Sequence, residues 1–204
     1  MTTQPEPVCE PDTALSARER WYLDPWHTAV HFAVLNRGAG LVRGRFTHLS
    51  GTLAPGKDQL RDTEVEVTIE AMSVTTGVVT RDDHLRSGFL DVEHHPTIRF
   101  LGNRLTRTGP LHGELGGTLE FRGRPVDIEL AVRWAGSAVD PFRDDARHLA
   151  FRATGRLTLT ELGLAQDLLP GLRIPGLGDA VELTLDVVLL PYDPAPMLRD
   201  IPVG

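Results

Sequence analysis

The chain has little cysteine and no long apolar run, and these two absences exclude several classes of protein. Cys9 is the only cysteine among 204 residues, so no internal disulfide can form. No segment is apolar and long enough to cross a bilayer as a helix, so stable membrane insertion is not expected. No apolar run precedes Cys9, and neither a signal peptide nor a lipid-anchor signal is visible. These absences predict a soluble, cytoplasmic protein.

Sequence signals of nucleic-acid binding and of common catalytic sites are also missing. The net charge is −7 and no basic stripe appears, which argues against nucleic acid as a partner. There is no phosphate-binding loop, no nucleophile elbow and no pair of carboxylates at a defined spacing. An enzyme is therefore the less favoured interpretation, and no cofactor is expected.

The histidines do not favour a metal site. His27 and His31 are four residues apart and share one face of a strand, and His84 could join them as a third ligand. No cysteine accompanies them, and only Asp24 and Asp82 are plausible additional ligands. We therefore predict no bound metal ion.

Strands dominate what the sequence does contain. In residues 64–71, Val65, Val67 and Ile69 alternate with glutamate and threonine, which indicates one buried and one wet face. The same alternation marks further predicted strands at residues 30–35, 42–46, 111–121, 126–134, 149–159 and 181–189. Ordered structure is expected over residues 21–192, between a disordered arm at 1–20 and a Pro-rich tail at 193–204.

A short polar helix is expected between two of these strands. Thr80 is the predicted N-cap, with Asp83 as its capping-box partner, and Gly88 is the predicted stop. Arg81, Asp82 and His84 would then lie together on a crossover at one end of the strands.

About eight short antiparallel strands with one helix predict an all-β barrel rather than a sandwich, because a sandwich gives no reason for an inserted polar helix. Small residues on inward strand faces leave two interpretations open. They either leave space in the barrel for a ligand or only permit bulges and strong twist. These residues are Gly113, Gly117, Ala153 and Gly155.

A set of motifs gives the chain a family resemblance. They are the segments at residues 24–32 (DPWHTAVHF), 73–76 (SVTT), 81–89 (RDDHLRSGF), 95–100 (HPTIRF) and 117–123 (GTLEFRG). In this order and spacing the chain resembles the YceI-like family of lipocalin-like, polyisoprenoid-binding proteins. The resemblance implies an extended eight-stranded antiparallel barrel whose lumen holds a long isoprenoid or fatty-acyl chain. Family members often dimerise, so a homodimer is one expectation, with Trp134 or the apolar connection at residues 168–177 as its contact.

We predict that the protein carries or stores a long apolar molecule, such as an isoprenoid lipid, a quinone precursor or a fatty-acyl chain. A chain of roughly 20 carbons would gain about 6 kcal/mol after association costs. The alternative is an enzyme that folds an apolar substrate in the lumen, with His84 and Asp82 as acid and base. Arg81 and Asp82 could instead only fasten the helix to the barrel. The predicted ligand-contacting residues are Val30, Phe32, Val34, Phe46, Val67, Ile69, Arg81, Asp82, His84, Phe89, Ile98, Phe100, Leu115, Leu119, Val132, Trp134, Phe151, Leu157, Leu183 and Leu185.

Overall fold

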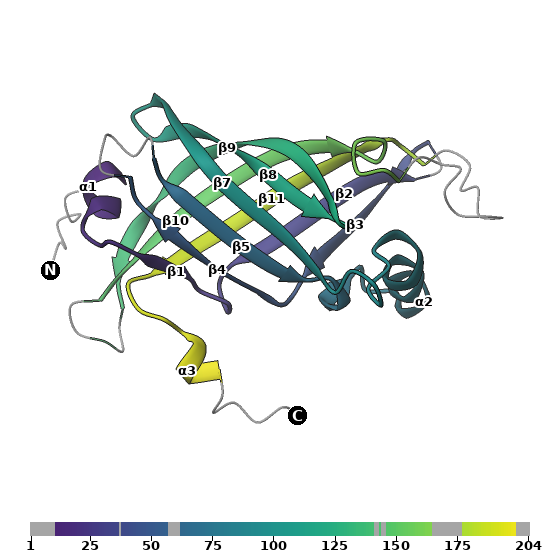
Figure 1. Ribbon diagram of the computed structural model, residues 1–204, viewed down its shortest axis with the longest axis horizontal. Coiled ribbons are helices and arrows are strands. Elements are labelled where there is room, and N and C mark those ends of the chain that lie inside the picture. Colours follow the sequence, from purple (N-terminus) through teal and green to yellow (C-terminus); the bar gives the residue numbers. More distant parts are fainter. Residues whose placement is uncertain are drawn as a thin grey trace, which may run out of the picture.

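Eight antiparallel strands close into an elongated barrel, with helix α1 at one end and α2 at the other (Figure 1). The protein is seen in a computed structural model, which describes residues 11–36, 38–56, 62–140, 143, 146–164 and 177–198. The predicted fold class, an extended lipocalin-like barrel with a short helical crossover, is confirmed.

The element bounds are as follows. The strands are β1 (Trp21–Leu23), β2 (Ala29–Asn36), β3 (Gly40–Phe46), β4 (Leu49–Ala54), β5 (Glu64–Glu70), β6 (Val74–Thr75), β7 (Thr97–Gly109), β8 (His112–Phe121), β9 (Arg124–Val139), β10 (Arg147–Thr158) and β11 (Ala180–Leu190). The helical segments are α1 (Pro11–Ser16), η1 (Ala71–Ser73), α2 (Val79–His84), the π-helical turn η2 (Leu85–Phe89) and α3 (Ala195–Leu198).

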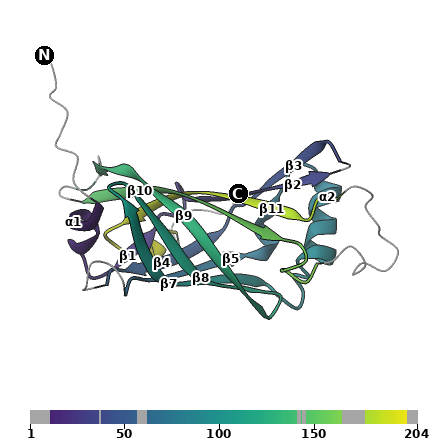
Figure 2. The ribbon, with the colours of Figure 1, turned by 90° about the horizontal axis from the view of Figure 1, so that it is seen from above.

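The ring runs β1-β4-β5-β7-β8-β9-β10-β11 and closes where β11 bonds back to β1. β2 follows β1 along the same edge of β11, so the two act as one interrupted strand. β3 pairs with β2 along its length and with β6 at Arg45 and Phe46. This branch leads to α2, which lies at the end of the barrel opposite α1 in both views (Figures 1 and 2).

The predicted alternation of strand faces holds, and several strands run longer than expected. In β9, the even-numbered positions from Val126 to Leu130 and Trp134 are buried, whereas Asp127, Glu129 and Arg133 are exposed. β9 continues past Trp134 to Val139 through Gly136, whose φ of +134° accompanies a register shift against β10. Glycine tolerates this conformation because it has no Cβ.

Of the four small residues predicted to face inward, two are covered by neighbouring side chains and two border open space. Neighbouring side chains cover Gly117 and Gly155, because an added Cβ would lie 2.8 Å from the Phe100 ring and 2.6 Å from Leu130, respectively. Gly113 and Ala153, in contrast, border an interior cavity. Small residues therefore admit large neighbours in one part of the barrel and leave open space in another.

Replacing Gly117 with alanine is expected to destabilise the barrel. The new Cβ would lie 2.5 Å from the carbonyl oxygen of Leu101 and 2.8 Å from the Cα of Gly102, so backbone must shift. Overpacking of this kind costs about 2 kcal/mol, or roughly 4–8 °C in Tm for a chain of this size. Thermal unfolding monitored by circular dichroism measures this loss. Gly40→Ala is the matched control, since its nearest atom is 3.7 Å away; an equal Tm loss in both variants would contradict the prediction.

The helical crossover begins and ends differently from the sequence prediction. The N-cap of α2 is Val78, which makes no side-chain cap, and Thr80 lies inside the helix. The chain passes Gly88 in the π-helical turn η2 instead of stopping there. The backbone N–H of Asp82 bonds to the carbonyl of Val78, and its carboxylate reaches back to the preceding loop. The bond between the Asp82 carboxylate and the preceding loop, rather than a Thr80 cap, therefore accompanies the start of the helix.

The segments predicted as arm and tail contain ordered parts. Residues 11–16 form α1, in which Ala14 and Leu15 are buried, and the Trp21 indole Nε1 donates to the Leu15 carbonyl at 2.8 Å. Residues 195–198 form α3. Most of the connection at residues 168–177, predicted as a dimer contact, lies outside the described residues, and Trp134, the other predicted contact, is buried within the barrel.

Candidate ligand-binding cavity

An interior cavity of about 160 Å³ occupies the part of the barrel next to α1. Inward-facing residues of β5, β7, β9, β10 and β11 contribute to its wall, and α1 and the turn between β7 and β8 border it at one end. The apolar lining consists of Leu15, Leu23, Val30, Leu49, Leu53, Val65, Val67, Phe100, Leu105, Leu111, Leu115, Leu130, Val132, Trp134, Phe151, Ala153, Leu185, Val187 and Leu189.

Polar groups are few and are concentrated near α1. Asp12, Arg107 and His112 come from α1 and the β7–β8 hairpin, and the lining also includes Thr28, Thr52 and Thr63. The cavity therefore combines apolar walls with a charged end, an arrangement typical of small-molecule sites.

Two aromatic rings contribute to the wall at β9 and β10. Trp134 and Phe151 meet edge to face, with ring centroids 5.0 Å apart and an interplanar angle of 72°. The Trp134 indole N–H is buried and has no hydrogen-bond partner among the described residues. Ala153 lies next along the inward face of β10, between Val132 and Leu185 in register, and its short side chain leaves the space in front of it open.

The structure brings only part of the predicted ligand-contacting set to this cavity. The members that line it are Val30, Val67, Phe100, Leu115, Val132, Trp134, Phe151 and Leu185. The apolar members that pack in the hydrophobic core without lining it are Phe32, Val34, Phe46, Ile69, Phe89, Ile98, Leu119, Leu157 and Leu183. Arg81, Asp82 and His84 lie on α2, at the other end of the barrel.

Asp82 fastens α2 to the loop that precedes it. Its carboxylate accepts hydrogen bonds from the Thr75 hydroxyl at 3.1 Å, the Thr76 N–H at 2.8 Å and the Thr76 hydroxyl at 2.6 Å. Burial alone would raise the pKa of this carboxyl, but the hydrogen bonds from Thr76 and Thr75 and the charge of Arg86 together lower it. The group is therefore held as a carboxylate.

Arg81 and His84 do not form an acid–base pair with Asp82. The Arg81 guanidinium donates to the hydroxyl of Thr76 at 2.7 Å and to its carbonyl at 3.1 Å. His84 is exposed, and no hydrogen bond joins it to Asp82 among the described contacts. The contacts of Arg81 and Asp82 match the fastening role that the sequence left open.

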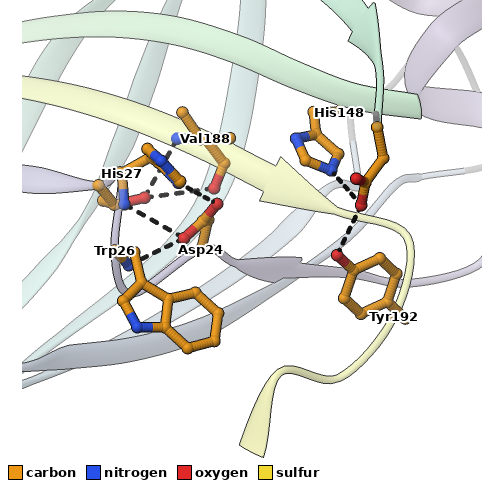
Figure 3. Close-up of polar contacts among 8 residues, drawn as sticks. Asp24, Trp26, His27, His148, Val188 and Tyr192 are labelled. Atoms are coloured by element: carbon orange, nitrogen blue, oxygen red, sulfur yellow. Dashed lines mark hydrogen bonds and ion pairs between the residues drawn. The ribbon is translucent and has the colours of Figure 1, made fainter. Parts of the chain in front are cut away.

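The turn between β1 and β2 depends on Asp24, whose side chain is buried. Asp24 Oδ1 accepts the N–H groups of Trp26 and His27, and Oδ2 lies 2.7 Å from His27 Nδ1 (Figure 3). The Thr28 hydroxyl donates to the Val188 carbonyl and accepts from its N–H, so it replaces backbone pairing where the strand is interrupted. The motif at residues 24–28 therefore shapes the barrel wall.

A second buried carboxylate, Asp140, joins the end of β9 to the C-terminal segment. Its Oδ2 lies 3.1 Å from His148 Nε2 and accepts the Tyr192 hydroxyl at 3.0 Å (Figure 3). The Arg143 guanidinium stacks on the Tyr192 ring at 4.0 Å. Burial, followed by the bond to Asp140, raises the pKa of Tyr192, so the phenol keeps the proton that it donates.

Neither a metal cluster nor a membrane-spanning helix is found in the described ranges. No group of three or more His, Cys, Asp or Glu side chains within them is placed to hold a metal ion. None of the helices there is long and apolar enough to cross a membrane.

Sequence comparison assigns the chain to a family. The model of the YceI-like domain matches residues 21–189. The chain belongs to the YceI-like family. A UPF0312 protein of Pectobacterium atrosepticum is 29% identical over 171 residues, which span 83% of this chain and 88% of that protein. A UPF0312 protein of Vibrio vulnificus is 26% identical over 139 residues, or 68% of this chain and 72% of that protein.

Solved structures share the YceI-like barrel. BcnA of Burkholderia cenocepacia superposes with a TM-score of 0.67 at 15% identity, covering 81% of this chain and 98% of BcnA. A polyisoprenoid binding domain from Saccharophagus degradans, implicated in plant cell wall breakdown, gives 0.62 at 16% identity and covers 83% and 97%, respectively. At these identities the comparison supports the fold.

Sequence reasoning missed the residues at the charged end of the cavity. Asp12 and Leu15 fall in the predicted disordered arm, and Arg107 lies at a register shift in β7. A signal for α1 was present: Pro11 suits the first helical position, Asp12 suits the first turn, and Ala14-Leu15 supplies an apolar face. One short turn without a longer periodic pattern was too little to distinguish from a loose arm.

Proposed function

We propose that this YceI-like protein binds an apolar small molecule in the cavity beside α1 and carries or stores it. The observation that supports this proposal is the cavity of about 160 Å³ with mainly apolar walls inside the barrel. Well-packed interiors contain few voids larger than a water molecule. Apolar cavities that do exist stay dry and take up apolar molecules.

The cavity volume limits what fits while α1 is in place. A cavity of about 150 Å³ in another protein holds a single benzene ring. The cavity here, about 160 Å³, has room for one ring or for about six carbons at the end of a chain. Six methylenes contribute about 5 kcal/mol at roughly 0.8 kcal/mol each, and association consumes much of this gain. Tight binding of a longer molecule therefore requires contacts beyond the present cavity.

The family supports a ligand of this kind. The Saccharophagus degradans relative is described as a polyisoprenoid binding domain, and the shared barrel extends this expectation to the present chain. Asp82 and His84, the acid and base of the enzyme alternative, lie on α2 and are not among the residues that line the cavity, so the cavity does not support that pair as its catalytic groups. A cytoplasmic location and a homodimer remain predictions from the sequence.

The proposal is tested on protein purified without detergent. Native mass spectrometry is expected to show an added mass that denaturation releases, and solvent extraction followed by lipid analysis identifies it. If the protein is isolated empty, it should take up an added isoprenoid alcohol or fatty acid. An empty protein that takes up neither added compound would overturn the proposal.

A further inference from the structure

We propose that α1 occupies the entrance as a built-in substitute for an amphiphilic ligand, and that Arg107 binds the anionic head group of that ligand. The inference rests on the proposed function and adds the ligand class: one apolar chain that carries a carboxylate or phosphate. Within α1, Asp12 and Leu15 are three residues apart and so share a face of the helix. Leu15 is 3% exposed, and both residues border the cavity.

Arg107 is held ready for an anion. Its Nε donates to the Gly109 carbonyl and its Nη2 to the Pro110 carbonyl, each at 3.1 Å, so the β7–β8 turn fixes the guanidinium. Its Nη1 points to the Asp12 carboxylate at 2.5 Å. A ligand carboxylate or phosphate can accept the same N–H, because guanidinium geometry suits both anions.

The hold on α1 is weak enough for a ligand to replace it. A helix of six residues is unstable on its own, so tertiary contacts must keep it in place. The Arg107 and Asp12 side chains are 46% and 42% exposed, and ion pairs at this exposure contribute little. Within the part of the chain that the structure describes, the other anchors are the buried Ala14 and Leu15 side chains and the hydrogen bond from Trp21. An incoming chain can take the apolar space of Leu15 while its head group takes the place of the Asp12 carboxylate.

This replacement explains how a cavity of about 160 Å³ can serve a longer molecule. Displacing Leu15 joins the interior to the entrance, so the accessible length increases. A neutral chain of equal length gains the same apolar contact but leaves Arg107 unused. We therefore expect the protein to prefer an anionic amphiphile over a neutral one.

Isothermal titration calorimetry with three compounds tests the inference. Palmitate, hexadecyl phosphate and hexadecanol share one chain length and differ in the head group. Wild type is expected to bind at least one of the two anions about fivefold more tightly than the alcohol, and the comparison of the two anions identifies the head group. Arg107→Gln should remove this preference. Asp12→Asn, which removes the internal carboxylate, should tighten binding of the preferred anion about threefold to fivefold and change alcohol binding less. Arg99→Gln is the matched control, since Arg99 pairs with Glu66 and Glu120 on the outer face of the barrel.

The outcomes separate this inference from the proposed function. If wild type and Asp12→Asn bind none of the three compounds and also take up no isoprenoid alcohol, the proposed function itself fails. If all three bind wild type equally and Arg107→Gln changes nothing, the cavity binds apolar molecules but Arg107 is not the head-group site. A loss of anion preference in Arg99→Gln equal to that in Arg107→Gln would also overturn the inference, because the effect would then be one of overall charge.

Discussion

Replacing Ala153 with phenylalanine is expected to abolish uptake of apolar molecules while the barrel remains folded. Ala153 lies between Val132 and Leu185 on the inward face, and all three side chains line the cavity. The added ring matches the size of a benzene molecule, which a cavity of about 150 Å³ just accommodates. Most of the 160 Å³ would therefore be filled from within. The affinity for a bound fatty acid or isoprenoid alcohol should fall at least tenfold by titration calorimetry.

Ala131→Phe is the matched control for this experiment. Ala131 is exposed on the outer face of the adjacent strand β9, so the same substitution there leaves the interior unchanged. Ala153→Leu fills less of the space and should give an intermediate loss, which guards against a variant that overpacks and unfolds. Unaltered binding in a folded Ala153→Phe protein would show that the ligand site lies elsewhere.

Replacing Asp82 with asparagine is expected to cause the largest loss of stability among single polar changes on α2. The carboxylate accepts three hydrogen bonds from Thr75 and Thr76 and is 5% exposed. An amide keeps one acceptor oxygen for the two Thr76 donors, but it places an NH2 group where Oδ2 accepted the Thr75 hydroxyl, and it removes the negative charge that strengthens all three bonds. The expected cost is about 3 kcal/mol in the free energy of unfolding, or roughly 6–12 °C in Tm. Denaturant and thermal unfolding measure both quantities.

The same carboxylate should give wild type a distinctive acid sensitivity. Because the pKa of Asp82 is lower in the folded protein than its ordinary 3.8, its stabilising contribution is present above that value. The contribution is lost as pH falls below 3.8 through the folded pKa, and Asp82→Asn lacks this part of the pH dependence. Asp83→Asn is the control, since Asp83 is exposed and pairs only with Arg86 among the described contacts. A similar Tm loss in both variants would contradict the prediction.

Strand positions could be predicted from the sequence because each strand carries its own signal. The alternation from Val126 to Trp134 follows from one face packing inside the barrel and the other meeting water, whatever the neighbouring strands are. The strand periodicity alone does not distinguish a closed barrel from a sandwich. The family resemblance carried by the motifs adds the prediction of a closed barrel. The barrel fold could therefore be predicted from the sequence.

The position of the cavity was not predictable in the same way, because it depends on which large side chains enter the space left by small ones. Gly117 and Ala153 are both small residues on inward faces, yet the Phe100 ring covers the first and the second borders the cavity. The charged residues of α2 are clustered in the sequence, and that clustering alone predicts a site there. The pair at the cavity, Asp12 and Arg107, is 95 residues apart and has no sequence signal of its own.

The barrel closes between β1 and β11, which come from opposite ends of the described chain, and this affects how the chain folds. Tyr22 pairs with Leu190, and Thr28 bonds to Val188, which lies 160 positions further along the sequence. The ring can therefore close only when β1 and β11 are both available to pair. During synthesis, β1 stays without this partner until β11 has emerged from the ribosome. Long-range pairing of this kind slows folding and leaves an open sheet exposed in the meantime. Any factor that shields β1 or α1 in that interval would act on yield rather than on the stability of the finished barrel.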